Sequence, residues 1–115
     1  MATYYHNPNC TKSRKGLDML KERNLEFTVK EYLKEPLSEE ELDNLFLKLG
    51  KTPAEVVRKK EQSYQDLELS EKNLSSKEWC QIIMENPELL ERPILLTEQK
   101  AIIGRPPELM LVLCD

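Results

Sequence analysis

Residues 3–32 read TYYHNPNCTKSRKGLDMLKERNLEFTVKEY, and this stretch decides the fold. Its pattern predicts a short strand at 3–6, a loop, a helix over about 11–23, and a second strand at 27–32. We expect Asn24 to end the helix in a left-handed conformation. Because a strand–helix–strand crossover is right-handed and returns in the same direction, the two strands should be parallel.

The middle of the chain has the signals of several helices. Ser38-Glu39-Glu40-Glu41 is a capping box, and Gly50 ends the helix that it begins. Thr52-Pro53 repeats the start signal, with proline at the first helical position. The run Ser75-Ser76-Lys77-Glu78 starts another helix, which Asn86-Pro87 stops.

The C-terminal part predicts two more strands and a helix. Residues 94–97 and 101–103 are expected to form a β-hairpin, followed by a helix at 107–113. The buried residues of this helix should be Leu109, Met110 and Val112 or Leu113. The order of elements predicts an α/β fold of the thioredoxin-like (glutaredoxin-like) class. We expect one domain, 1–115, in which a mixed sheet of about four strands has a helical insertion at about 37–90, between its βαβ and ββα halves.

Bulk properties place the protein among cytoplasmic globular domains with no membrane partner. Of its 115 residues, 39% are hydrophobic and 33% are charged, and no apolar run reaches the roughly 20 residues that a membrane span needs. The first residues hold neither a basic stretch nor an apolar signal core. The formal net charge of −4 disfavours nucleic-acid binding, and it means that an anionic substrate needs a local cationic cluster.

The three cysteines, Cys10, Cys80 and Cys114, are an odd number at wide spacing. They make a poor disulfide framework, and no group of cysteines and histidine has the spacing of a zinc site. We therefore expect a reducing compartment and no metal.

Cys10 is the candidate nucleophile because it stands between a strand and a helix. The first turn of a helix offers unpaired N–H groups and a positive dipole end, and both favour the thiolate over the thiol. The same groups form a nest for a tetrahedral oxyanion. An isolated cysteine is more often a small packed residue, but here Pro8 and Asn9 shape a turn just before it.

Ser13 and His6 are candidate supporting residues for this cysteine. Ser13 completes a Cys-x-x-Ser motif, the monothiol version of the Cys-x-x-Cys redox motif. Its hydroxyl could donate a hydrogen bond to the thiolate or simply belong to the first helical turn, but it cannot resolve a mixed disulfide. His6, the single histidine, could hold the thiolate electrostatically, steady the loop, or fill the end of the sheet as a buried neutral side chain.

Five segments carry a more specific pattern. They are His-Asn-Pro-Asn-Cys-Thr-Lys-Ser-Arg at 6–14, Glu31-Tyr32-Leu33 with Pro36, Val57-Arg58-Lys59 with Tyr64, Glu91-Arg92-Pro93-Ile94, and Ile103-Gly104-Arg105-Pro106-Pro107. Together they resemble the glutaredoxin-dependent arsenate reductase (ArsC) family over nearly the whole chain. The first segment is similar to the family's His-Asn-Pro-x-Cys-x-x-Ser-Arg.

The resemblance implies that Cys10 is the nucleophile and that Arg58, Arg92 and Arg105 converge on the oxyanion. Guanidinium groups suit this task because they donate planar, charge-assisted hydrogen bonds to a phosphate-shaped anion such as arsenate. The resemblance also implies a cis peptide bond at Pro93, opposite the nucleophile. Apart from the resemblance, each arginine is expected to be a surface residue or half of an ion pair. This expectation is strongest for Arg58.

The reaction implied by the resemblance is the thiol-dependent reduction of arsenate to arsenite. Cys10 forms a covalent thiol-arsenate, glutathione attacks this adduct as a co-substrate, and glutaredoxin clears the resulting mixed disulfide. No tightly bound cofactor is required.

Two other functions are compatible with the expected fold. One is a glutathione-linked thiol oxidoreductase that acts on disulfides or on another oxyanion. The other is a regulatory protein that binds RNA polymerase. The three arginines favour an anion site, and regulators of this type often carry a two-cysteine redox switch, which Ser13 removes here.

Overall fold

The computed structural model describes residues 2–114. The chain divides into two compact units. Unit 1 comprises Met1–Glu35 together with Arg92–Asp115, and unit 2 comprises Pro36–Glu91. Unit 2 is the segment between the βαβ and ββα halves, where the sequence predicts an insertion at about 37–90.

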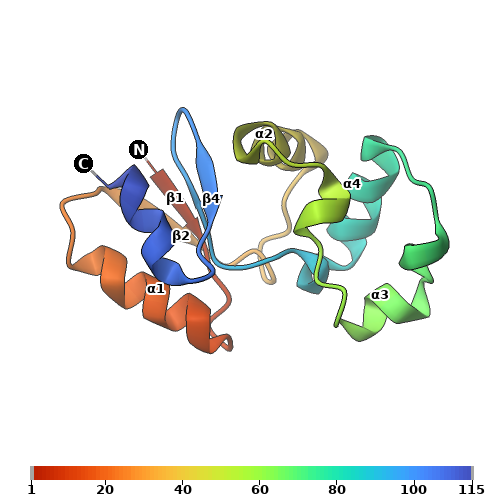
Figure 1. Ribbon diagram of the computed structural model, residues 1–115, viewed down its shortest axis with the longest axis horizontal. Coiled ribbons are helices and arrows are strands. Elements are labelled where there is room, and N and C mark those ends of the chain that lie inside the picture. The colour runs from red at the N-terminus through yellow and green to blue at the C-terminus, as the bar shows by residue number, and fades with distance from the viewer. Residues whose placement is uncertain (1, 115) are drawn as a thin grey trace. The chain divides into compact units, whose positions relative to one another are not determined.

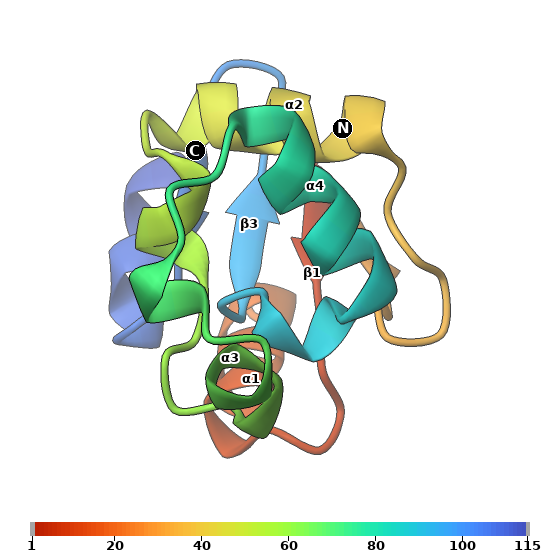
Figure 2. The same ribbon diagram turned by 90° about the vertical axis from the view of Figure 1, so that its right-hand side faces the viewer.

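Unit 1 is built on a four-stranded sheet with the order β2-β1-β3-β4. β1 (Ala2–Tyr5) and β2 (Phe27–Lys30) are parallel and are joined by α1 (Thr11–Lys21), as predicted. β3 (Ile94–Leu96) runs antiparallel to β1, and Figure 2 shows these two strands side by side. β4 (Ala101–Ile103) runs antiparallel to β3, so the hairpin is also confirmed. The mixed four-stranded sheet confirms the thioredoxin-like α/β fold.

The strand register brings three segments of the chain to one end of this sheet. Tyr5 pairs with Ile94, and Ile94 pairs with Ile103. The chain therefore leaves β1, enters β3 and leaves β4 at the same end. Beyond the strands, the N–H of Gly104 donates to the carbonyl oxygen of Pro93 at 2.8 Å. The loop after β1 and the residues flanking β3 and β4 consequently meet at one edge.

Two helical segments pack next to the sheet of unit 1. α1 and the C-terminal segment η4 (Pro107–Leu113), drawn in blue, lie side by side in Figure 1. Their apolar faces and the sheet share one core of buried side chains, namely Ala2, Tyr4, Leu20, Leu95, Met110 and Cys114. Burial of these groups stabilises the unit that carries Cys10.

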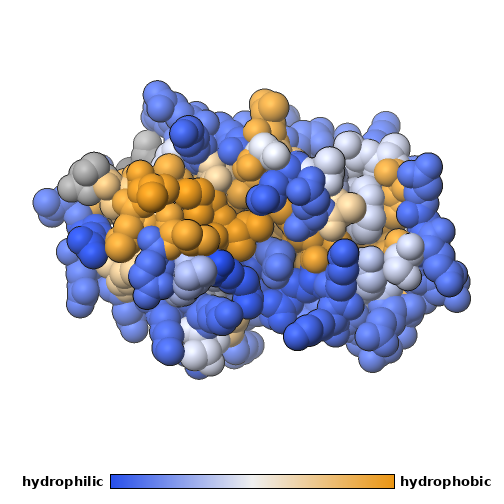
Figure 3. All heavy atoms as spheres, viewed as in Figure 1, coloured by the Kyte–Doolittle hydropathy of each residue, from blue (hydrophilic) through white to orange (hydrophobic). Residues whose placement is uncertain are grey.

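The C-terminal segment corrects one prediction. η4 is a 3₁₀ helix, in which side chains three positions apart lie on one face. Met110 is buried and Leu113 is partly buried, whereas Leu109 and Val112 are 48% and 75% exposed. Figure 3 shows an apolar surface over this segment. Met110 is buried as predicted, and of the two alternatives Val112 and Leu113 it is Leu113 that is partly buried. The prediction that Leu109 is buried was wrong, because the 3₁₀ spacing places it on the exposed face with Val112.

The end of α1 corrects another prediction. The helix ends at Lys21, and within residues 2–114 Glu68 is the only non-glycine residue with a positive φ, so Asn24 is not left-handed. The N–H groups of Glu22 and Arg23 donate to carbonyl oxygens three residues back, at 3.3 and 3.0 Å. These bonds satisfy the last carbonyls, so no left-handed residue is needed.

Unit 2 consists of short helices. Its elements are α2 (Glu39–Leu49), η1 (Pro53–Val56), α3 (Gln62–Asp66), η2 (Leu69–Glu71), α4 (Ser76–Glu85) and η3 (Pro87–Leu89). The predicted capping boxes at Ser38 and Ser75 are present, and Gly50 ends α2 with a φ of 67°. The start signal at Thr52-Pro53 produces only a 3₁₀ turn. α2 and α4 contact each other, and their buried apolar residues include Leu42, Leu45, Trp79 and Ile83.

None of the helices in residues 2–114 combines the length and the apolar character that a membrane crossing needs. In the same part of the chain, no group of three or more His, Cys, Asp or Glu side chains could hold a metal ion.

Candidate active site

Cys10 is the N-cap residue of α1, with an extended backbone. Its N–H donates to the carbonyl oxygen of Asn7 at 3.0 Å, which closes the loop into a turn. The side-chain oxygen of Asn7 accepts the N–H of Asn9 at 3.0 Å, and Arg14 Nη1 donates to the carbonyl oxygen of Pro8 at 2.8 Å. These bonds hold the half-buried Cys10 at the N-terminus of α1. It lies between β1 and α1, as the sequence predicts.

The pKa of the Cys10 thiol lies below its ordinary value. Partial burial raises this pKa, but the backbone N–H of Ser13, the guanidinium of Arg92 and the backbone N–H of Lys12 together outweigh burial. The N–H groups act on the sulfur electrostatically, since the Cys10 side chain forms no regular capping hydrogen bond. The first turn of α1 therefore favours the thiolate, which is the nucleophilic form.

Arg105 and Arg92 place guanidinium groups beside the sulfur. Nη2 of Arg105 lies 3.8 Å from Sγ of Cys10, and its Nε donates to the carbonyl oxygen of Arg92 at 2.8 Å. The guanidinium of Arg92 interacts with the same sulfur. Both arginines precede cis prolines: the resemblance implied the cis bond at Pro93, whereas the one at Pro106 was not predicted.

Ser13 is fully buried, and its hydroxyl bonds to residues other than Cys10. Oγ accepts the N–H of Asn7 at 3.0 Å and lies 2.7 Å from Nδ1 of His6. Its effect on the pKa of Cys10 comes from the backbone N–H. The hydroxyl thus ties the first turn of α1 to the loop after β1.

His6 is buried, and its pKa is lowered. Burial is the main cause, the positive charges of Arg14 and Lys21 add to it, and the negative charge of Glu31 opposes it. The imidazole is therefore neutral at pH 7 and carries no charge that could hold a thiolate. Of the roles considered from sequence, its bond to Ser13 favours steadying the loop.

Arg58 belongs to unit 2. Its Nε lies 3.4 Å from Oε2 of Glu61, and its Nη1 lies 3.7 Å from Oε1 of Glu91. Its backbone N–H donates to the carbonyl oxygen of Leu89 at 2.7 Å. In the structure, the side chain of Arg58 forms ion pairs with these two glutamates. The role of Arg58 in binding the oxyanion stays a prediction.

Sequence reasoning missed Tyr4, whose hydroxyl donates to the carbonyl oxygen of Ser13 at 2.6 Å. The available signal was Gly16, since a glycine inside a helix costs about 1 kcal/mol relative to alanine. A Cβ added to Gly16 would collide with the Tyr4 hydroxyl and would lie 2.9 Å from Cε of Met110. The glycine allows α1 to approach the tyrosine closely.

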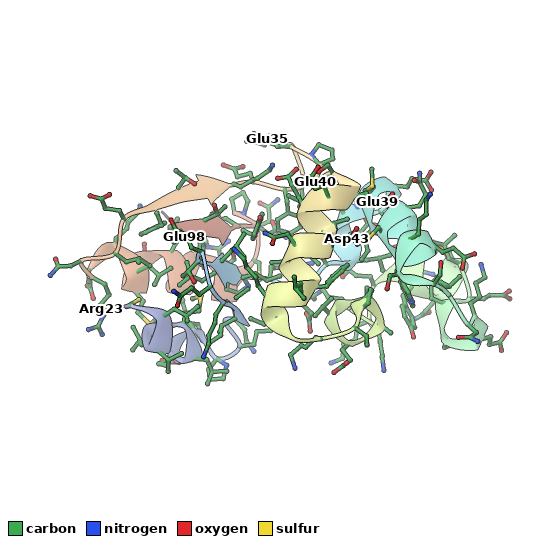
Figure 4. All side chains as sticks on the ribbon, turned by 90° about the horizontal axis from the view of Figure 1, so that it is seen from above. Arg23, Glu35, Glu39, Glu40, Asp43 and Glu98 are labelled. Atoms are coloured by element: carbon green, nitrogen blue, oxygen red, sulfur yellow. The ribbon has the colours of Figure 1, made fainter. Side chains whose placement is uncertain are left out.

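The other two cysteines are buried thiols. Burial and the neighbouring carboxylate of Asp43 raise the pKa of Cys80 to about 12, and its Sγ donates to that carboxylate at 3.4 Å. Figure 4 labels Asp43 on α2. Cys114 donates to the carbonyl oxygen of Met110 and packs in a core with Leu20, ten residues along α1 from Cys10. At 1.5 Å per residue, that separation is about 15 Å.

The chain is similar to known proteins in sequence and in fold. The sequence pattern of the ArsC family matches residues 5–113. The uncharacterized protein YfgD of Escherichia coli (strain K12) is 44% identical over 108 residues, which are 93% of this chain and 91% of that protein. The arsenate reductase of Neisseria meningitidis serogroup B is 42% identical over 105 residues, 90% of each chain. The solved arsenate reductase from Vibrio cholerae has a TM-score of 0.89 at 38% identity, covering 96% of this chain and 95% of that one. This chain belongs to the ArsC family.

Proposed function

We propose that this protein reduces arsenate to arsenite with Cys10 as the nucleophile. The observation that carries the proposal is the sulfur of Cys10 at the N-terminus of α1, with the guanidinium groups of Arg92 and Arg105 beside it. One local arrangement activates a thiolate and supplies donors for a tetrahedral oxyanion. Membership of the ArsC family and the similarity to arsenate reductases support arsenate as that oxyanion.

In the first step, the thiolate of Cys10 attacks the arsenic atom of arsenate. A sulfur–arsenic bond forms, one arsenic–oxygen bond breaks, and the oxygen leaves as water after taking up protons from solvent. Arsenic remains As(V) in this adduct. Arg92 and Arg105 stabilise the negative charge on the remaining oxygens, and the loss of one such donor costs about 2.7–4 kcal/mol where oxyanion holes have been tested. We assign Arg58 to the same anion as a third donor.

In the second step, a thiol from another molecule attacks the sulfur of the adduct. The sulfur–arsenic bond breaks, its electron pair reduces As(V) to As(III), and Cys10 is left in a mixed disulfide. Cys80 is a poor candidate because its pKa is high, and Cys114 lies in the core by Leu20. We assign the role to glutathione, in the reducing compartment of the cytoplasm.

In the third step, glutaredoxin uses a second glutathione to reduce the mixed disulfide. The disulfide of Cys10 is exchanged for oxidised glutathione, and the Cys10 thiol is regenerated. Ser13 stands where a Cys-x-x-Cys motif has its resolving cysteine, which is consistent with this dependence on an external thiol. The sequence of reactions needs no tightly bound cofactor.

A coupled assay tests the proposal. NADPH consumption is followed with arsenate, glutathione, glutaredoxin and glutathione reductase, and it should depend on both arsenate and the protein. Cys10→Ser should abolish it, whereas Cys114→Ser should retain it. An equal rate with wild type and Cys10→Ser would contradict the assignment of the nucleophile, and no arsenate-dependent rate with wild type would contradict arsenate as the substrate.

A further inference from the structure

Tyr4 is a buried polar residue that the reaction above does not use. It lies in β1 and is 0% exposed, and its hydroxyl donates to the carbonyl oxygen of Ser13 at 2.6 Å. Its ring packs 5.7 Å from that of His6 and 6.3 Å from that of Phe27, measured between centroids. Burial is the main cause that raises the pKa of this phenol, so it stays protonated and acts as a donor.

This hydrogen bond depends on Gly16. A Cβ at that position would collide with the Tyr4 hydroxyl, so any larger residue displaces either the phenol or the helix. The cost of glycine inside a helix, about 1 kcal/mol relative to alanine, is therefore explained by the contact that it permits. Tyr4 and Gly16 form one complementary pair between β1 and α1.

Ser13 is the residue on which these contacts converge. Besides the bond from Tyr4 to its carbonyl oxygen, its Oγ accepts the N–H of Asn7 at 3.0 Å and lies 2.7 Å from Nδ1 of His6. Ser13 is the third residue of α1, after the N-cap residue Cys10, and its N–H makes the largest contribution that lowers the pKa of the thiol. The first N–H groups of a helix have no partner inside the helix, so their direction depends on what holds the residues that carry them.

The peptide group between Ser13 and Arg14 provides a second link. The Tyr4 hydroxyl polarises its carbonyl, and the N–H of Arg14 in the same peptide group donates to the carbonyl oxygen of Cys10 at 3.0 Å. Hydrogen bonds on the two sides of one peptide group strengthen each other. Through this peptide group, the hydroxyl acts on the backbone of the cysteine.

We propose that Tyr4 is a positioning residue for Cys10. Its hydrogen bond to the carbonyl of Ser13, in the space that Gly16 leaves, orients the first turn of α1 so that the N–H of Ser13 points at the sulfur. The inference rests on Cys10 as the nucleophile of the proposed function, but it does not require arsenate to be the substrate.

Tyr4→Phe tests this directly, because it keeps the ring and removes the hydroxyl. The apparent pKa of Cys10, measured from the pH dependence of its alkylation by iodoacetamide, should rise by about half a unit, the effect of weakening one hydrogen bond. Tyr5→Phe is the matched control, since Tyr5 is buried in the same strand and points to the opposite face. An unchanged pKa in Tyr4→Phe, or an equal rise in Tyr5→Phe, would overturn the proposal.

Gly16→Ala tests the pair. In the wild-type background the added methyl group should raise the pKa of Cys10, because it displaces the Tyr4 hydroxyl. In the Tyr4→Phe background the same substitution should change this pKa much less, since the hydroxyl no longer occupies the space. Equal changes in both backgrounds would show that the two residues act independently and would contradict the proposal.

The arsenate assay separates positioning from a general structural role. If Tyr4→Phe only lowers the thiolate fraction, its loss of turnover should disappear as the pH is raised above the new pKa. A loss that persists at every pH would contradict positioning. If wild type reduces no arsenate, the proposed function fails, while the alkylation measurement still decides the role of Tyr4.

Discussion

Nη2 of Arg105 lies 3.8 Å from Sγ of Cys10, although the two residues are 95 positions apart in sequence. The sheet register produces this contact, because the end of β1 and the end of β4 flank the start of β3. The bond from Arg105 Nε to the carbonyl oxygen of Arg92 then orients the guanidinium toward the sulfur. A thiolate and a donor for its target are thus held by backbone geometry.

Arg105→Ala should raise the apparent pKa of Cys10 and lower arsenate turnover by about a hundredfold, as expected for one lost oxyanion donor. Arg105→Lys should recover turnover only in part, because a lysine has one nitrogen and cannot contact both the carbonyl of Arg92 and the sulfur. Arg23→Ala is the control: this arginine lies on the surface just beyond α1 and is labelled in Figure 4. Equal losses in Arg105→Ala and Arg23→Ala would show that only net charge matters.

Thiol labelling should separate the three cysteines. Below pH 8, iodoacetamide should modify Cys10 in the folded protein and leave Cys80 and Cys114 unmodified, as judged by peptide mass spectrometry. The modification rate should fall as the pH falls through the pKa of Cys10, which is lowered from its ordinary value. Labelling of Cys80 at a comparable rate would contradict its burial and its bond to Asp43.

His6 should make stability dependent on pH. Because its pKa is lower in the folded protein than its ordinary value of about 6.5, its contribution is complete above that pH and is lost as the pH falls below it. The free energy of unfolding, measured by urea titration, should therefore decline as the pH falls below about 6.5. His6→Gln should flatten the decline, and an identical slope in both proteins would contradict a neutral buried imidazole.

The 3₁₀ spacing of η4 predicts that alanine substitutions of Met110 and Val112 lower the free energy of unfolding by different amounts. Met110→Ala should lower the free energy of unfolding by about 2–5 kcal/mol, because it leaves a cavity in the core. Val112→Ala should change it by no more than about 0.5 kcal/mol, since Val112 is 75% exposed. Similar losses in the two variants, measured by chemical denaturation, would contradict the described face of η4.

The sequence predicts most of the fold because its signals are local. Ser38, Ser75 and Gly50 mark helix ends through hydrogen bonds and backbone angles that involve only near neighbours, and the structure has all three. The errors at η4 and Asn24 arose where tertiary packing, or a choice between 3₁₀ and α-helical bonds, decides the outcome.

In the candidate site, too, the features that depend on local sequence were predictable and those that depend on tertiary structure were not. The position of Cys10 before a helix follows from local pattern, whereas its contacts with Arg92 and Arg105 depend on strand register. Tyr4 was not found because its partner, the carbonyl of Ser13, is a backbone group that any residue could offer. Only the presence of glycine inside α1 indicated that something approaches the helix closely.

The most direct test of the account is a single turnover with glutathione and arsenate but without glutaredoxin. Peptide mass spectrometry of Cys10 and quantification of arsenite should show one mixed disulfide with glutathione for each arsenite formed, and neither product with Cys10→Ser. A mixed disulfide that forms equally well without arsenate, or the absence of arsenite from the wild-type reaction, would contradict Cys10 as the residue that transfers electrons to arsenic.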